Sequence, residues 1–210
     1  MESAQPVNAV TERVTIPVLG SVENWKDQLK SMLQALNKQP GCLRTRWGPW
    51  TEDQQKLELI IGWINAEACE TWKKSEDFAN AMVKLAPVLN GEPSSYLLQF
   101  KPFAPQAVIN SPVVEMLSFE NCHEPDNKMR EMVEGAARMP GCNGVASGYS
   151  LRPSPGPGGS GDAGRTFVAA IGWAGLEASR QADKSTYTGG SKTESHHVDF
   201  NFPVKGFGGL

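Results

Sequence analysis

The sequence contains two copies of one pattern, and this repetition constrains the fold more than any other feature. Pro-Gly-Cys at positions 40–42 recurs at 140–142, and Ile-Gly-Trp at 61–63 recurs at 171–173. Glu-Ala follows the second landmark in both copies, at 67–68 and at 177–178. Landmarks that recur in one order indicate a duplicated structural unit. The second copy is longer between its landmarks because of residues 152–164, whose Pro- and Gly-rich composition predicts a flexible loop.

Each copy predicts the same order of strands and helices. A short β-rich run opens each copy, at residues 13–19 and 113–119. An amphipathic helix follows, starting at Ser21 or Asn24 in the first copy and near Pro125 in the second. Both helices stop at Pro-Gly, because proline lacks a backbone N–H and glycine tolerates positive φ. Two strands, a second helix and a last strand complete each copy, at residues 42–47, 56–63, 66–89 and 95–103, and again at 142–147, 165–173, 176–184 and 196–202.

A βαββαβ unit folds into a four-stranded antiparallel sheet with both helices on one face and the other face bare. We expect the third strand of each copy to line that bare face with Leu57, Leu59, Ile61 and Trp63, and with Phe167, Ala169, Ile171 and Trp173. Covering about 500 Å² of such surface is worth on the order of ten kcal/mol. The predicted fold class is therefore α+β. Two tandem ferredoxin-like repeats, at residues 10–105 and 110–203, would turn their sheets toward each other as an intramolecular α/β barrel around a cavity, followed by a tail at 204–210.

Composition and charge argue against several classes of function. Twenty Lys and Arg against 23 Asp and Glu give a net charge of −3, which offers no basic surface to nucleic acid or an anionic membrane. The longest apolar run, residues 57–64, contains Glu58 and is too short to span a bilayer. The N-terminal residues lack the basic and apolar regions of a secretory signal. We therefore expect a cytoplasmic protein without nucleic-acid or membrane partners.

The four cysteines form no metal-binding or disulfide pattern. Cys42, Cys69, Cys122 and Cys142 lie far apart, with no CxxC and no histidine at ligand spacing. A chain without an export signal keeps its thiols reduced, and such cysteines behave as small buried hydrophobes. We expect no metal site and no cofactor.

The Ile-Gly-Trp strand end, followed by Glu-Ala and an amphipathic helix, resembles the dimeric α/β-barrel superfamily. This superfamily includes antibiotic-biosynthesis monooxygenases and stress-responsive A/B-barrel proteins. The resemblance covers most of residues 10–203 and implies a fused tandem form of fungal type. Its members include cofactor-free oxygenases, polyketide cyclases and other lyases, isomerases, haem enzymes and proteins with no known activity, so the fold leaves the chemistry open.

The monooxygenase residues of the family carry over only in part. The quinone-forming members line their cavity with a Trp that ends the third strand, and an Asn stands four residues before it. Trp63 and Trp173 match the Trp, whereas Leu59 and Ala169 stand at the Asn positions. The resemblance therefore implies no complete oxygenase site here.

This sequence also lacks the histidines used by two other groups of the superfamily. Plant cyclases of this fold use two histidines, whose positions hold Val113 and Phe78 in this sequence. Haem-binding relatives need a proximal histidine, and His123, at the start of a loop, fits that role poorly. The resemblance thus gives no support to haem.

Three side chains are candidates for proton transfer. His196 and His197 are adjacent on the last strand, so one of them must face the cavity, where an imidazole can act as acid or base. Glu115 lies on the side of its strand that the family register turns toward the cavity, where apolar neighbours disfavour its charged form. We predict that His197, His196 and Glu115 are catalytic. The alternatives are polar residues tolerated at a barrel end, and a strand-end Glu paired with an Arg.

Aromatic side chains dominate the candidates for ligand binding. The 210 residues include six tryptophans, and four of these lie at predicted strand ends or in hairpins. Aromatic walls offer a planar apolar ligand a large contact area, and an arginine can hold a carboxylate or phenolate. The predicted binding residues are Trp63, Trp173, Tyr96, Trp47, Arg46, Phe167 and Tyr149. Core packing and an exposed charged strand edge are the alternatives.

These observations predict a cofactor-independent enzyme of small-molecule (secondary) metabolism. Its substrate would be an apolar polyketide-like, aromatic or terpenoid-like molecule, and its reaction a proton transfer in cyclisation, isomerisation or elimination. A cofactor-free monooxygenase and a non-catalytic ligand-binding or stress-response barrel are the alternatives. The fused barrel is expected to be a monomer or a homodimer.

Overall fold

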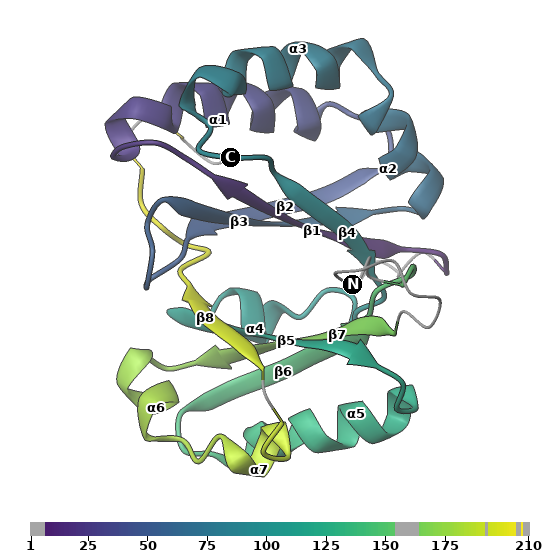
Figure 1. Cartoon of the computed structure of the whole chain (residues 1–210), viewed down its shortest axis with the longest axis vertical. Helices are drawn as coiled ribbons and strands as arrows, with labels where there is room; N and C mark the ends of the chain where they lie inside the picture. The colour runs from purple at the N-terminus through teal and green to yellow at the C-terminus, as the bar shows by residue number, and fades with distance from the viewer. Residues whose placement is uncertain (1–6, 154–163, 192, 205–206, 208–210) are drawn as a thin grey trace. The chain divides into compact units, whose positions relative to one another are not determined.

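The computed structural model describes residues 7–153, 164–191, 193–204 and 207, and it divides into two compact units (Figure 1). Unit 1 comprises Met1–Ser95 together with Asn201–Leu210, and unit 2 comprises Tyr96–Phe200. Most of the loop predicted at 152–164, and most of the tail predicted at 204–210, lie outside the described residues.

Unit 1 is built from one antiparallel sheet and a layer of helices. In chain order its elements are β1 (Val10–Pro17), α1 (Val22–Asn37), β2 (Cys42–Pro49), β3 (Lys56–Trp63), α2 (Ala66–Lys73), α3 (Glu76–Leu85), the 3₁₀ turn η1 (Ala86–Val88) and β4 (Ser94–Leu98). Strand β4 belongs to the sheet of unit 1 but continues past Ser95, where the unit boundary falls. The strands lie in the order β2-β3-β1-β4, which confirms the βαββαβ prediction.

Unit 2 repeats this topology. Its elements are α4 (Gln106–Ile109), β5 (Val113–Cys122), α5 (Asp126–Val133), the 3₁₀ turn η2 (Glu134–Arg138), β6 (Cys142–Tyr149), β7 (Arg165–Trp173), α6 (Leu176–Gln181), α7 (Ser185–Thr188) and β8 (Glu194–Val198). The strand order β6-β7-β5-β8 matches that of unit 1 element by element. The two ferredoxin-like repeats are thus present, whereas the closure of their sheets into a barrel stays a prediction.

The repeated sequence landmarks touch each other in both units. Gly41 has a φ of +84° and Gly141 a φ of +81°, so each Pro-Gly pair ends its helical segment in the left-handed region. A Cβ atom on Gly41 would come within 2.8 Å of the Ala68 Cβ, and one on Gly141 within 2.8 Å of the Ala178 Cβ. The Pro-Gly-Cys and Glu-Ala motifs therefore recur together because the turn and the second helix pack without room for a side chain.

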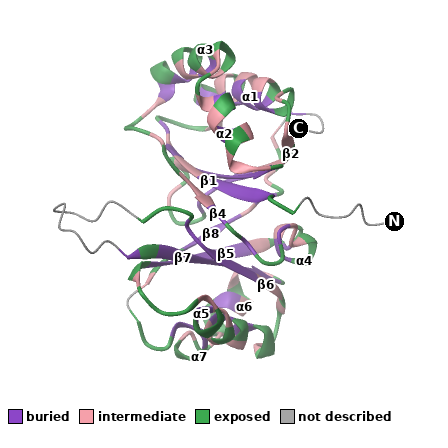
Figure 2. Cartoon of the chain, turned by 90° about the vertical axis from the view of Figure 1, so that its right-hand side faces the viewer, coloured by how far each residue is buried: buried purple, intermediate pink, exposed green. Residues whose placement is uncertain are grey.

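The helices cover the sheet face that we expected to be bare, so the predicted register is wrong. In unit 2, Phe167, Ala169, Ile171 and Trp173 belong to one buried cluster with α5 and α7. In unit 1, Leu59 and Ile61 lie beneath α1 and α3. Every residue from Leu57 to Trp63 is buried, so β3 carries no alternation that separates one face from the other. Figure 2 shows this burial of the strands beside helices that keep an exposed side.

The second helix predicted at residues 66–89 is in fact two helices. Lys74 caps the end of α2, and Ser75 starts α3 by accepting the Phe78 backbone N–H on its side-chain oxygen at 3.1 Å. Glu76 and Asp77 follow in the first turn of α3, where the positive end of the helix dipole favours acidic residues. The break turns α3 along the sheet and brings Phe78 beside Trp72, with ring centroids 5.3 Å apart.

No helix among the described residues is both long and apolar enough to cross a membrane. All four cysteines are free thiols, and Cys69 is the most buried of them. Within the described part of the chain, no group of three or more His, Cys, Asp and Glu side chains is arranged to hold a metal ion.

Candidate active site

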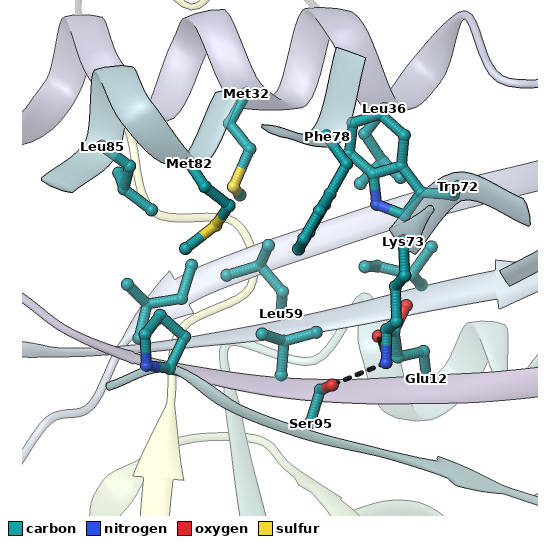
Figure 3. A pocket seen from close by; sticks show the side chains of 14 residues that line it. Glu12, Met32, Leu36, Leu59, Trp72, Lys73, Phe78, Met82, Leu85 and Ser95 are labelled. Carbon is teal, nitrogen blue, oxygen red and sulfur yellow. Dashed lines mark hydrogen bonds and ion pairs between the residues drawn. The ribbon is translucent and has the colours of Figure 1, made fainter. Parts of the chain in front are cut away.

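A pocket of about 140 Å³ lies inside unit 1, between the sheet and its helices (Figure 3). Strands β1 and β3 supply its floor, and α1, α2 and α3 supply its roof. Most of its lining is apolar. The lining residues are Glu12, Val14, Ile16, Met32, Leu36, Leu59, Ile61, Trp72, Lys73, Phe78, Met82, Leu85, Pro93 and Ser95.

The polar side chains of this pocket gather at one end. The Lys73 Nζ lies 2.8 Å from the Glu12 Oε1 and donates to the Ser95 Oγ at 2.8 Å. Trp63 donates its indole Nε1–H to the Glu12 Oε2 at 2.9 Å. The Glu12 side chain is 3% exposed and the Lys73 side chain 36% exposed, so the carboxylate is buried while the ammonium reaches solvent. Figure 3 shows Glu12, Lys73 and Ser95 together below Trp72 and Phe78.

Local structure explains why these residues meet. Alternation along β1 places Glu12, Val14 and Ile16 on one face of the sheet. The Asn65 side chain accepts the Ala68 backbone N–H at 2.8 Å and thereby fixes the start of α2. Lys73 stands in the last turn of α2, where a cation is favoured by the helix dipole. The end of α2 thus delivers an ammonium group to the buried carboxylate of β1.

This arrangement can hold an oxygen atom of a small molecule and exchange a proton with it. An ammonium and a hydroxyl can both donate to a carbonyl or phenolate oxygen, and the adjacent carboxylate can accept a proton. The apolar walls can receive the rest of the molecule. Cys69 also lies near Glu12, and burial, reinforced by that carboxylate, raises the pKa of its thiol. A neutral thiol is a poor nucleophile, so we assign Cys69 no reactive role.

Unit 2 carries the same polar set at the equivalent place. Val10 pairs with Trp63 in unit 1 and Val113 pairs with Trp173 in unit 2, so Glu12 corresponds to Glu115. Trp173 donates to the Glu115 Oε2 at 3.1 Å, and the Lys184 Nζ donates to its Oε1 at 2.6 Å. The Ser195 hydroxyl donates to the Glu115 Oε1 at 3.0 Å.

Two further hydroxyl groups bind the carboxylate of unit 2. Ser179 donates to the Glu115 Oε2 at 3.2 Å, and Tyr187 donates to the same oxygen at 3.2 Å. Five side chains therefore donate to Glu115, which is fully buried. The His197 Nε2 lies 2.8 Å from the Ser179 Oγ, so a histidine reaches the carboxylate through one serine.

Comparisons with known proteins find that part of the first repeat is similar to one domain family. Residues 18–84 match the family model described as antibiotic biosynthesis monooxygenase, which covers most of unit 1. A search of curated proteins finds no match to the chain.

Solved structures support the fold of the whole chain. An anthrone oxidase-like protein matches with a TM-score of 0.63 at 10% identity, covering 93% of this chain and 92% of the other. A candidate monooxygenase from Lactobacillus acidophilus gives 0.55 at 12% identity, covering 91% and 93%. A third, from Fusobacterium nucleatum subsp. nucleatum, gives 0.57 at 13% identity, covering 91% and 92%. At these identities the likeness shows the fold alone.

The predicted catalytic residues lie on both faces of the second sheet. Glu115 pairs with His197 across β5 and β8, and both point toward α6 and α7, where Ser179 joins them. His196 pairs with Met116 and points to the opposite face. The expectation that Glu115 faces a cavity between the sheets is wrong, because its partners Ser179, Lys184 and Tyr187 belong to the helical layer.

The predicted binding residues are mostly core residues of their own unit. Trp63 and Trp173 do not face away from the helices, because each indole donates to the glutamate beneath the helical layer. Trp47 packs edge-on against Trp25 of α1, with ring centroids 6.0 Å apart. Phe167 packs against Tyr149 at 4.9 Å, in the buried cluster of unit 2.

Arg46 and Tyr96 stand apart from these clusters. Arg46 pairs with Ile60 across β2 and β3, on the face away from the pocket, and donates to the Thr45 carbonyl oxygen at 3.2 Å. Tyr96 follows Ser95 on β4, so alternation turns it away from the pocket as well.

Sequence reasoning missed Glu12, Lys73 and Ser95 of unit 1. A signal for Glu12 was present, because a glutamate stands at the same place in both copies, after Val-Thr at 10–11 and after Val-Val at 113–114. No comparable signal marks Lys73, because its place depends on where α2 ends.

Proposed function

We propose that unit 1 is the reactive repeat of a cofactor-independent enzyme that removes a proton from a small, largely apolar molecule. The observation that supports this most is the Glu12–Lys73 pair at one end of an apolar pocket. A carboxylate beside an ammonium can take a proton and stabilise the anion that forms, without any added group.

In the proposed step, an oxygen of the substrate accepts hydrogen bonds from the Lys73 Nζ and the Ser95 Oγ. The Glu12 carboxylate takes a proton from the C–H bond next to a carbonyl, whose electron pair becomes a C=C bond while the π pair of the carbonyl moves onto its oxygen. Where the proton comes from an O–H bond, the electron pair stays on the oxygen. The resulting enolate or phenolate is held by the Lys73 ammonium. Return of the proton to a different carbon completes an isomerisation, and loss of a leaving group from the anion completes an elimination.

Oxygenation is the second candidate, and the match of residues 18–84 to the monooxygenase family model favours it. The same anion can pass electrons to molecular oxygen as the co-substrate. A CH₂ group then becomes a carbonyl, and the second oxygen atom leaves as water. Both candidates begin with the proton transfer assigned to Glu12, so they differ only in the fate of the anion.

The chemistry expected for His197 and Glu115 remains a rival proposal for unit 2. Its weakness is that Glu115 already accepts from five side chains, so a substrate would have to displace at least one of them. Glu12 instead stands at an apolar space of about 140 Å³. This difference is why the proposal assigns proton transfer to unit 1.

Matched variants of the two repeats test the assignment. Phenylacetone in D₂O reports proton removal as deuterium uptake at its CH₂ group, measured by NMR, and an oxygen electrode reports oxygenation of the same compound. We expect Glu12→Gln to reduce the exchange rate at least 100-fold and Lys73→Met at least tenfold. Glu115→Gln and Lys184→Met should stay within threefold of the unaltered protein once the folded fraction is corrected for.

The outcomes separate the candidates. Loss of exchange in Glu115→Gln with normal exchange in Glu12→Gln would move the reaction to unit 2. Oxygen uptake equal to the phenylacetone consumed would select the oxygenase. Binding of phenylacetone without exchange or oxygen uptake in any variant would leave only the non-catalytic ligand-binding function.

A further inference from the structure

The two repeats share their polar set but differ in what lies against it. In unit 2 the Tyr187 side chain is fully buried, and its hydroxyl donates to the Glu115 Oε2 at 3.2 Å. Its ring lies 6.3 Å from the Trp173 ring, between centroids, within the cluster of α5 and β7 side chains. Burial, reinforced by the Glu115 charge, raises the pKa of Tyr187, so the phenol stays neutral and donates. In unit 1, pocket space lies beside Glu12.

Smaller neighbours make room for Tyr187 in unit 2. The strand position filled by Leu59 in β3 is filled by Ala169 in β7. The position of Leu36 in α1 corresponds to Ala136 in η2, four residues before the Pro-Gly pair in both copies. Leu36 and Leu59 line the pocket of unit 1, whereas Ala136 and Ala169 pack in one cluster with Tyr187. In the second repeat, two leucines of the pocket wall are replaced by alanines, and the Tyr187 ring fills the space that this leaves.

We infer that Tyr187 is a built-in occupant of the second repeat's copy of the site, and that it reveals the ligand class of the first. Among the described residues, the copy of this site that is open to a ligand is then the one in unit 1, which takes a monocyclic phenol or the corresponding enol. The ligand hydroxyl donates to Glu12 as Tyr187 donates to Glu115, and its ring lies among the apolar side chains. The inference that unit 1 takes this ligand rests on the proposed function, whereas the role of Tyr187 does not.

The size of the pocket agrees with this ligand class. An apolar cavity of about 150 Å³ in a protein accepts one benzene ring. The pocket of unit 1 measures about 140 Å³, which suits one ring and not a fused set of three or four. A larger ligand would leave its other rings outside the pocket.

Two indole N–H groups report on the two repeats separately. Trp63 donates to Glu12 and Trp173 donates to Glu115, so a hydroxyl that arrives at either carboxylate changes the NMR shift of the adjacent indole proton. The probe is p-cresol, the side-chain analogue of tyrosine, titrated into the full chain. We expect it to shift the Trp63 indole signal and leave the Trp173 signal in place. Toluene, which lacks the hydroxyl, should bind at least tenfold more weakly.

Variants at Tyr187 then test whether its side chain fills the ligand position of unit 2. Tyr187→Gly should create a second site, in which p-cresol also shifts the Trp173 indole signal and raises the melting temperature of the variant. The control Tyr187→Phe keeps the ring in place, so p-cresol should shift only the Trp63 indole signal of this variant and leave the Trp173 signal unchanged. If Tyr187→Gly does not fold without ligand, Tyr187→Ala is measured in the same way, and recovery of the fold with p-cresol supports the inference.

The experiments distinguish a wrong role for Tyr187 from a wrong ligand class for unit 1. A shift at Trp173 in the unaltered protein, or a folded Tyr187→Gly that gains no second site, overturns the role of Tyr187 and leaves the proposed function intact. No shift at Trp63 in the unaltered protein, with a gained site in Tyr187→Gly, keeps the role of Tyr187 and removes phenols as ligands of unit 1. Equal binding of toluene and p-cresol at Trp63 overturns the ligand class alone.

Discussion

The two repeats share one set of Glu, Trp, Lys and Ser side chains around a buried carboxylate, yet they use it differently. Unit 1 surrounds Glu12 with an indole, an ammonium, the Cys69 thiol and pocket space. Unit 2 surrounds Glu115 with five donors, one of which is the phenol of Tyr187. A duplicated site can therefore keep its polar frame while one copy is converted to core. The difference lies in a few apolar and aromatic side chains and not in the charged residues.

Tyr187→Ala should produce a larger loss of stability than the matched aromatic change in the pocket wall of unit 1. Tyr187 is fully buried, and removal of a buried aromatic side chain costs about 3–5 kcal/mol in unfolding free energy. Phe78→Ala is the matched change in unit 1, where the ring is part of a pocket wall and only half-buried, and about 1–2 kcal/mol is expected. Urea unfolding followed by tryptophan fluorescence measures both. Equal losses would contradict the view that only unit 2 is filled.

The second contrast concerns the two glutamates. Glu115→Gln weakens hydrogen bonds from five donors around a fully buried group, and we expect a loss of about 2–4 kcal/mol. Glu12→Gln disturbs the contacts with Trp63 and with the partly exposed Lys73, and about 1–2 kcal/mol is expected. The same urea experiment compares them. A larger loss for Glu12→Gln would mean that the unit 1 set is structural and not held ready for a ligand.

Much of the fold could be predicted from the sequence because the same order of landmarks occurs in both repeats. The bounds predicted for the third strands, residues 56–63 and 165–173, coincide with β3 and β7. The faces of those strands could not be predicted, because β3 is apolar along its whole length and alternation is lost. The break between α2 and α3 was missed although Ser75, Glu76 and Asp77 form a recognisable helix start.

The candidate site could be predicted only in fragments. His197 and Glu115 were chosen separately and do lie close together, since β5 and β8 are neighbours in the sheet. Lys73 and Lys184 could not be found, because Lys73 reaches its glutamate from the last turn of α2 and Lys184 from the residue before α7, and the sequence does not fix these helix bounds. Tyr187 gave no signal, because a single tyrosine in the four-residue helix α7 forms no repeating pattern. Residues that come together because of where helices end and how side chains fill space can be identified only from the structure.

A smaller effect is expected from Gly172, which tests how the second sheet is covered on its other face. A Cβ atom on Gly172 would overlap the Ser111 hydroxyl and approach the Val108 Cα to 2.9 Å, beside helix α4. Helix α4 has no counterpart in the described elements of unit 1. Gly172→Ala should cost about 1–3 kcal/mol through this overlap. The control Gly144→Ala meets side chains only at 3.5 Å and should change the unfolding free energy by less than about 0.5 kcal/mol. Similar values for both would contradict close packing of α4 on β7.

The smallest expected effect is a difference in ionisation between the buried phenols of Tyr187 and Tyr149, and it appears only at alkaline pH. Burial raises the pKa of Tyr149 to about 12, and burial together with the Glu115 charge raises the pKa of Tyr187 as well. An unfolded tyrosine ionises near pH 10. Because both groups bind their proton more tightly in the folded chain, their contribution to stability is complete below about pH 10 and is lost as the pH rises through their folded pKa values. Absorbance at 295 nm follows the ionisation. We expect Tyr187→Phe to remove the latest component of the native titration and Tyr149→Phe to remove a component near pH 12. Ionisation of Tyr187 near pH 10 in the native protein would mean that its phenol is not held on Glu115.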